Sequence, residues 1–123
     1  MDILAMFKDS DKTLTFSKGE FIFHQGEPGG FMYVILEGEV DILLNDEVIV
    51  TFRPGHIFGE MALVDEGPRS ASAFVKTDCK IVPIDKDSFL YLVQNTPYFA
   101  LHVMKLLSMK VRTVNKKISA KSE

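Results

Sequence analysis

Short apolar runs separated by turn-forming residues fill the chain from about residue 14 to residue 85. The runs are rich in β-branched and aromatic residues and read LTF, EFIFH, FMYVIL, EVDILL, EVIVTF, SASAFV and CKIVPID. Between them lie pairs that favour tight turns, such as Lys18-Gly19, Asn45-Asp46 and Pro54-Gly55. Seven or eight short strands at this spacing predict an antiparallel sandwich or barrel.

The spacing of apolar residues becomes helical at both ends of this region. Residues 2–9, DILAMFKD, predict a short amphipathic helix. The stretch DKDSFLYLVQN places its apolar residues on one face and offers Asp85 or Asp87 as the N-cap of a second helix. A longer helix is expected to follow, with Thr96 as its N-cap and Pro97 at the first helical position, where a missing N–H costs nothing.

Length and composition fit one globular domain. The chain has 123 residues, of which 46% are hydrophobic and 25% charged. We expect a β-rich part over about residues 10–85 and C-terminal helices over about residues 86–120. No apolar run is long enough to cross a bilayer, and no secretory segment follows Met1. Cys79 is the only cysteine, so an internal disulfide is impossible and a cytoplasmic location is the simplest expectation.

The charge is unevenly distributed along the chain. Residues 105–123 carry six lysines and arginines against one glutamate, a balance of +5, which leaves −8 for the rest of a chain with net charge −3. A basic tail can bind nucleic acid or another anionic partner. Here the cations alternate with apolar residues at helical spacing, which favours the solvated face of a helix.

The long helix also carries an apolar seam. Met104, Leu107, Val111, Val114 and Ile118 follow one another at spacings of 3, 4, 3 and 4, the pattern of an interhelical contact. The first half of this helix can pack on the β-rich part of the same chain. The second half, beyond Lys110, predicts a partner, either a second copy in a homodimer, a missing domain or an unidentified protein. Packing of the seam on the same chain is the alternative.

The stretch FGEMALVDEGPRSAS, from Phe58 to Ser72, carries the clearest chemistry. Gly59 allows close approach of the backbone, and the turn after it can offer free N–H groups to an anion. Arg69 offers a planar fork of donors that matches a phosphate, while Glu60 suits a sugar hydroxyl. The residues therefore indicate a ligand with both ribose and phosphate. The alternative is that Glu60 and Arg69 form a structural ion pair.

Catalysis and metal binding find little support in the sequence. His24, His56 and His102 lie on different predicted elements without the spacing of metal ligands. Ser70 has no histidine near it in sequence that could activate it as a nucleophile. We therefore expect a binding protein without catalytic residues, metal or cofactor.

The stretch FGEMALVDEGPRSAS closely resembles the phosphate-binding cassette of cyclic nucleotide-binding domains. That family's pattern is F-G-E, an apolar-Ala-Leu step, a short variable loop, then P-R, a small or hydroxyl residue, Ala and another small residue. FHQGEPGGFMYVILEGEV looks like the family's strand, glycine turn and hairpin, and PGHIFGE is similar to its approach to the cassette. The resemblance implies a mainly β fold with α-helices: an antiparallel β-roll, or jelly roll, with a short N-terminal helix and C-terminal hinge and lid helices.

The resemblance also implies roles for individual residues. The backbone N–H groups of Gly59 and Ala62 would face the cyclic phosphate and ribose, and Glu60 would accept a hydrogen bond from the ribose 2′-hydroxyl. Arg69 would pair with the cyclic phosphate, and Ser70 would lie beside the phosphate and the purine edge.

The resemblance thus predicts two short runs of binding residues within the cassette and a few further contacts outside it. The nucleotide-binding residues would be Phe58, Gly59, Glu60, Met61, Ala62, Arg69, Ser70 and Ala71. Ile42 and Val50 are candidates for lining the base and sugar, and Arg112 and Thr113 for contacts from the lid helix.

The implied function is that of a sensor domain similar to those of the bacterial catabolite activator and of protein kinase A regulatory subunits. We expect cAMP rather than cGMP, because the chain resembles the bacterial branch, although Ser70 does not separate the two. Bacterial relatives continue into a helix-turn-helix, whereas this sequence ends at Glu123, so direct DNA binding is not expected. A sensor fragment of a larger regulator, or a structural domain of the same fold that no longer binds nucleotide, is the alternative.

Overall fold

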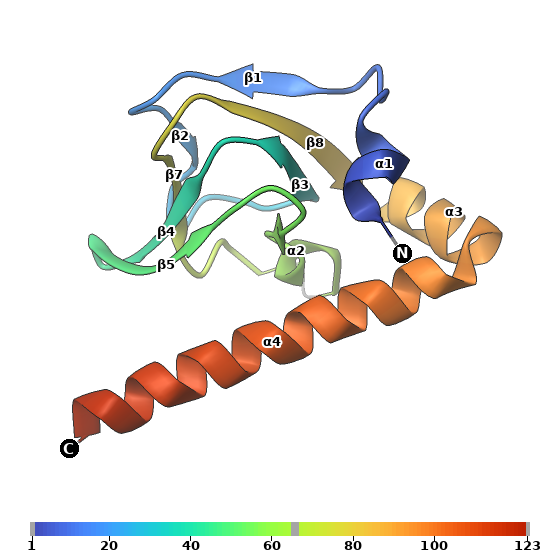
Figure 1. The fold of residues 1–123 in the computed structure, drawn as a ribbon. Coiled ribbons are helices and arrows are strands. Elements are labelled where there is room, and N and C mark those ends of the chain that lie inside the picture. The colour runs from blue at the N-terminus through green and yellow to red at the C-terminus, as the bar shows by residue number, and fades with distance from the viewer. Residues whose placement is uncertain (1, 65–66, 123) are drawn as a thin grey trace.

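The computed structural model describes residues 2–64 and 67–122, with side chains as far as Lys110. The elements are α1 (Ile3–Phe7), β1 (Leu14–Phe16), β2 (Phe21–Phe23), β3 (Phe31–Glu37), β4 (Val40–Leu44), β5 (Glu47–Phe52), β6 (Ile57–Phe58), α2 (Met61–Val64), β7 (Ser72–Val75), β8 (Cys79–Asp85), α3 (Lys86–Asn95) and α4 (Pro97–Ser122). The strands form two antiparallel four-stranded sheets, in the orders β1-β8-β3-β6 and β2-β7-β4-β5. Figure 1 shows the two sheets closing into a roll, with α4 running along one side of it. The expected antiparallel roll with flanking helices is confirmed.

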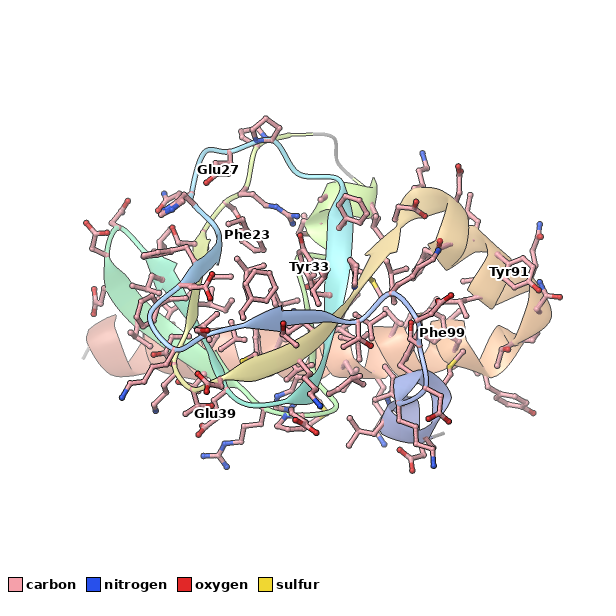
Figure 2. All side chains as sticks on the ribbon, turned by 90° about the horizontal axis from the view of Figure 1, so that it is seen from above. Phe23, Glu27, Tyr33, Glu39, Tyr91 and Phe99 are labelled. Atoms are coloured by element: carbon pink, nitrogen blue, oxygen red, sulfur yellow. The ribbon has the colours of Figure 1, made fainter. Side chains whose placement is uncertain are left out.

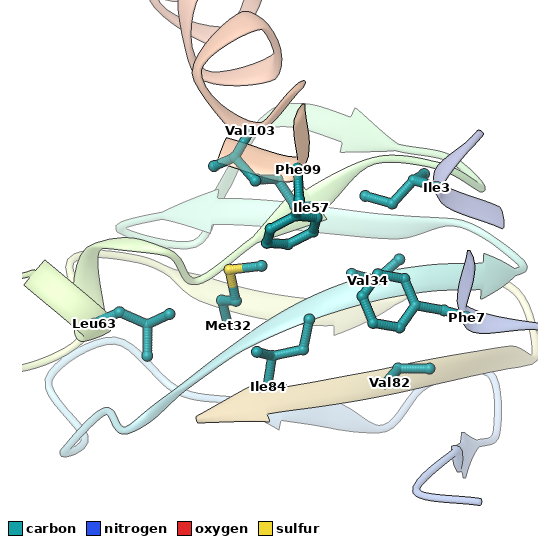
Figure 3. Close-up of a cluster of buried hydrophobic side chains, with 10 residues drawn as sticks. All are labelled: Ile3, Phe7, Met32, Val34, Ile57, Leu63, Val82, Ile84, Phe99 and Val103. Carbon is teal, nitrogen blue, oxygen red and sulfur yellow. The ribbon is translucent and has the colours of Figure 1, made fainter. Parts of the chain in front are cut away.

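Alternating residues of the central strands supply two separate cores, because successive side chains of a strand point to opposite faces. In β3, Ile35 faces the layer between the two sheets, whereas Val34 faces the helices. In β8, Ile81 and Val82 divide in the same way. The helix-side cluster consists of Ile3, Phe7, Met32, Val34, Ile57, Leu63, Val82, Ile84, Phe99 and Val103 (Figure 3). The first sheet is therefore covered on both faces.

The C-terminal helices begin where the sequence predicts. Asp85 is the N-cap of α3, and its side chain accepts a hydrogen bond from the backbone N–H of Ser88 at 2.8 Å. α4 begins at Pro97 and is fixed to the roll by Phe99 and Val103, which are 0% and 5% exposed.

None of the helices in the described part of the chain combines the length and apolarity that crossing a bilayer requires.

Gly38, between β3 and β4, brings the backbone unusually close to the β7–β8 turn. Its φ is +89°, and a Cβ there would collide with the carbonyl oxygen of Asp78 and lie 2.7 Å from the sulfur of Cys79.

Cys79 itself is buried between the sheets at 3% exposure. Desolvation, together with the nearby Asp78, raises the pKa of this thiol to about 11. The lone cysteine is therefore an unreactive core residue in the folded chain.

Candidate ligand-binding site

A cavity of about 580 Å³ lies between strands β4 and β5, the segment from Phe58 to Ala71, and α4. This volume falls within the range of roughly 300–1,000 Å³ that is typical of small-molecule sites. The lining residues are Phe23, Ile42, Ile49, Val50, Thr51, Phe52, His56, Ile57, Phe58, Gly59, Glu60, Met61, Ala62, Gly67, Pro68, Arg69, Ser70, Ala71, Leu106, Met109 and Lys110. Most are apolar, and the charged ones gather in the Phe58–Ala71 segment and on α4.

Gly59 directs the chain from β6 into this cavity. β6 pairs with β3, with Phe58 opposite Tyr33, and the chain then turns at Gly59 with φ of +77°. A Cβ at Gly59 would lie 2.8 Å from Nη1 of Arg69 and 3.1 Å from the carbonyl oxygen of Phe31. Only glycine meets both the backbone requirement and the space left by the guanidinium.

Arg69 is the buried cation of the cavity, with only 8% of its surface exposed. Its Nη1 donates to the carbonyl oxygen of Gly59 at 3.2 Å, and its Nη2 donates to that of Phe31 at 2.9 Å. The guanidinium carbon lies 4.0 Å from the ring centroid of Phe23, a cation–π contact. Its Nε has no hydrogen-bond partner among the described residues. A buried donor without a partner is costly, so this nitrogen favours an acceptor from elsewhere.

Burial shifts the pKa values of both Arg69 and the neighbouring Tyr33. Burial lowers the pKa of the Arg69 guanidinium, and the nearby Tyr33 and Glu27 act in the opposite direction. Burial raises the pKa of the Tyr33 hydroxyl, which Arg69 opposes. Figure 2 shows Phe23 and Tyr33 side by side in the interior of the roll, and their ring centroids are 6.0 Å apart. Because a guanidinium keeps its proton in proteins, Arg69 remains a cation next to the rings of Phe23 and Tyr33.

Glu60 pairs with a residue of α4 and not with Arg69. Nζ of Lys110 donates to both carboxylate oxygens of Glu60, at 2.8 Å and 2.9 Å. The side chains of Lys110 and Glu60 are only 20% and 16% exposed. The structural Glu60–Arg69 ion pair, which the sequence left open, is therefore not the pairing found here.

The structure brings most of the expected binding residues to one cavity. All eight residues predicted to bind the nucleotide, Phe58 to Ala62 and Arg69 to Ala71, line it, and so do Ile42 and Val50. One expected donor is engaged, because the N–H of Ala62 donates to the carbonyl oxygen of Gly59 at 3.2 Å. The side chains of Arg112 and Thr113 lie outside the described residues, so their predicted lid contacts stay predictions.

Several lining residues were not anticipated from the sequence. Phe23 and Phe52 look like ordinary core aromatics in the strand pattern, and the sequence does not indicate their contacts with Arg69 and Lys110. Leu106, Met109 and Lys110 come from α4, at spacings of 3 and 4 from Leu106. This spacing places them on one helix face, a signal that could have located the side of α4 that meets the cavity.

The histidines form no chemical cluster in the described residues. His56 borders the cavity, and its Nδ1 accepts a hydrogen bond from the N–H of Arg53 at 2.9 Å. Burial lowers the pKa of His56, with smaller contributions from Lys110 and Arg53. No group of three or more metal-ligating side chains is found among the described side chains, those of residues 2–64 and 67–110. Glu60, Arg69 and Lys110 supply the other acidic and basic side chains of the cavity lining.

Comparison with protein families gives one match that spans most of the roll. The family model "Cyclic nucleotide-binding domain" matches residues 13–96. Among curated proteins, the chain is 33% identical over 89 residues to a cAMP-dependent protein kinase regulatory subunit of Hypocrea atroviridis. It is 31% identical over 102 residues to the cyclic AMP receptor protein of Thermus thermophilus. These alignments cover 72% and 79% of this chain but only 19% and 47% of the two relatives.

Solved structures show the same fold. The catabolite activator protein of Thermus thermophilus superimposes with a TM-score of 0.77 at 29% identity, over 89% of this chain and 54% of that one. A cyclic nucleotide-binding domain from Methylobacillus flagellatus superimposes with a TM-score of 0.79 at 25% identity, over 89% of this chain and 66% of that one.

Proposed function

Because the chain belongs to the cyclic nucleotide-binding domain family, we propose that its cavity binds a 3′,5′-cyclic purine nucleotide. The observation that carries this proposal is the buried Arg69 guanidinium, whose Nε has no partner among the described residues, in a cavity that also presents Glu60. Arg69 pairs with the cyclic phosphate, and Glu60 accepts the ribose 2′-hydroxyl. The apolar side of the cavity, with Ile42 and Val50, takes the sugar and base.

The proposed ligand is cAMP in preference to cGMP. Support comes from the relatives, whose names describe a cAMP-dependent regulatory subunit and a cyclic AMP receptor protein. Gly59, Met61, Ala62, Ser70 and Ala71 line the cavity and would border the ligand.

The proposed role is regulation without catalysis. Ligand binding shifts α4, which carries Lys110 and Met109 to the cavity and is the element best placed to transmit occupancy. The seam of Met104, Leu107, Val111, Val114 and Ile118 makes α4 the proposed contact of a homodimer. Leu107 packs partly against the helix-side core of its own chain, so the exposed Met104 begins the surface available to a partner. A fold that no longer binds nucleotide remains the alternative function.

A titration with cAMP and cGMP tests the proposal. A ligand that binds only the folded state stabilises it by about 2.7 kcal/mol at 100 times its Kd. For a domain of this size we expect the melting temperature to rise by roughly 10 °C. The acyclic 5′-AMP is the control ligand.

Two further measurements on the same samples test the proposed role of α4. Hydrogen exchange over residues 97–110 reports whether α4 becomes more protected when ligand binds, and light scattering reports whether the chain is a dimer. No change in melting with millimolar cAMP or cGMP would contradict the proposed function.

A further inference from the structure

Lys110 is a partly buried cation on α4, and its side chain lines the cavity. It lies 50 positions from Glu60 in sequence, and its Nζ contacts both oxygens of that carboxylate. The same nitrogen lies 4.7 Å from the ring centroid of Phe52. Burial lowers the pKa of Lys110, and Glu60 opposes this shift by charge and hydrogen bonding. The ammonium is thus held in place by one acid and one aromatic ring.

The charge of Lys110 changes what the cavity can accept. Among the described residues that line it, the side chains that carry a charge near neutral pH are Glu60, Arg69 and Lys110. Without Lys110 the first two would cancel, and a partly buried carboxylate would repel an incoming phosphate. With Lys110 the three sum to one positive charge, which complements the single negative charge of a cyclic monophosphate.

We propose that Lys110 is a specificity-determining residue of the pocket, because its ammonium neutralises Glu60 and so makes the cavity selective for an anionic ligand. This inference rests on the proposed function. The ribose hydroxyl can still be accommodated, because a carboxylate offers about four acceptor sites and Lys110 occupies one on each oxygen. Glu60 then recognises a hydroxyl without excluding the phosphate.

The position of α4 does not depend on this contact alone. Phe99 and Val103 bury the start of the helix in the helix-side core, and Leu106 and Leu107 pack against the same cluster. Removing the charge of Lys110 therefore leaves the helix anchored. Methionine is an unbranched, flexible side chain only one atom shorter than lysine, and its thioether can contact the Phe52 ring in place of the ammonium, so Lys110→Met removes mainly the charge.

The test compares an anionic ligand with a neutral one of the same shape. We would measure the affinities of cAMP and of its uncharged cyclic-phosphate methyl ester by competition against a fluorescent cyclic nucleotide. Lys110→Met should weaken cAMP binding at least about tenfold and change ester binding less than about threefold. Lys110→Arg should restore most of the preference for cAMP. Lys105→Met, which removes an exposed lysine of the same helix, is the matched control and should leave both affinities unchanged.

The outcomes separate this inference from the proposed function. A parent chain that binds neither cAMP nor cGMP contradicts both. If the parent binds cAMP and Lys110→Met loses affinity for cAMP and for the ester equally, Lys110 has a structural role. If Lys110→Met binds both ligands as the parent does, Lys110 has no role in binding. Either result overturns the inference and leaves the proposed function intact. Glu60→Gln supplies a second check, because Lys110→Met should cost cAMP binding far less when the carboxylate is already neutral.

Discussion

Replacing Arg69 with alanine is expected to reduce the affinity for cyclic nucleotide by about 30-fold or more. The guanidinium is the buried donor proposed to meet the phosphate, and truncating one side of a buried charged pair costs about 2–5 kcal/mol. Calorimetric titration of the variant with cAMP measures the loss directly. The variant also removes the two hydrogen bonds that Arg69 donates to the carbonyl oxygens of Gly59 and Phe31, so its unfolding must be measured in parallel.

Two further variants keep the Arg69 prediction testable if the alanine variant folds poorly. Arg69→Lys retains a positive charge but loses the planar fork, and it should bind more weakly than the parent and more tightly than Arg69→Ala. Arg53→Ala removes an arginine whose side chain is 75% exposed and whose ion pair with Glu39 spans 3.6 Å. It should leave the affinity unchanged. Equal binding by the parent and a folded Arg69→Ala would place the phosphate elsewhere.

Replacing Phe99 with alanine is expected to lower the free energy of unfolding by about 3–5 kcal/mol. Phe99 is fully buried, and its ring makes edge contacts with Phe7 and Phe89 at centroid distances of 6.2 Å and 5.8 Å. It therefore joins α1, α3 and α4 to the first sheet, and its removal opens a cavity that three elements would have to close together. Urea unfolding followed by circular dichroism gives the change.

The neighbouring Tyr98 provides the control for this prediction. Its side chain is 73% exposed, so Tyr98→Ala should change the free energy of unfolding by less than about 0.5 kcal/mol. A loss below about 1 kcal/mol for Phe99→Ala would mean that the helix-side core does not depend on this ring.

Local features of the sequence were sufficient to predict most of the fold. The turn at Asn45-Asp46 is an example: both residues adopt positive φ, of 51° and 66°, as the primed turn of a two-residue hairpin requires. Asp85 likewise caps α3 through a contact three residues away. The two-residue strand β6 is absent from the quoted runs, because Ile57 and Phe58 are too few to establish an alternation and pair only with a distant strand.

In the candidate site, too, only features that lie close together in sequence could be predicted. Glu60 and Arg69 lie within one short segment, so their residue types and spacing could be interpreted together. The partner that each actually contacts could not be predicted. Lys110 reaches Glu60 across 50 positions, and Arg69 donates to Phe31 across 38. Such pairings are decided by how α4 and β3 pack in the folded chain, and no periodicity in a single sequence reports them.

The burial of Cys79 gives the chain a built-in chemical reporter of its own opening. As the only cysteine in the sequence, it is the only residue that a thiol-specific reagent can modify. Burial raises the pKa of its thiol to about 11, so the reactive thiolate is scarce at neutral pH, and the residue lies between the sheets. Modification must therefore wait until the sheets separate, so the labelling rate follows the population of open molecules. The parent sequence can thus be monitored with a coloured disulfide reagent, without introducing a probe.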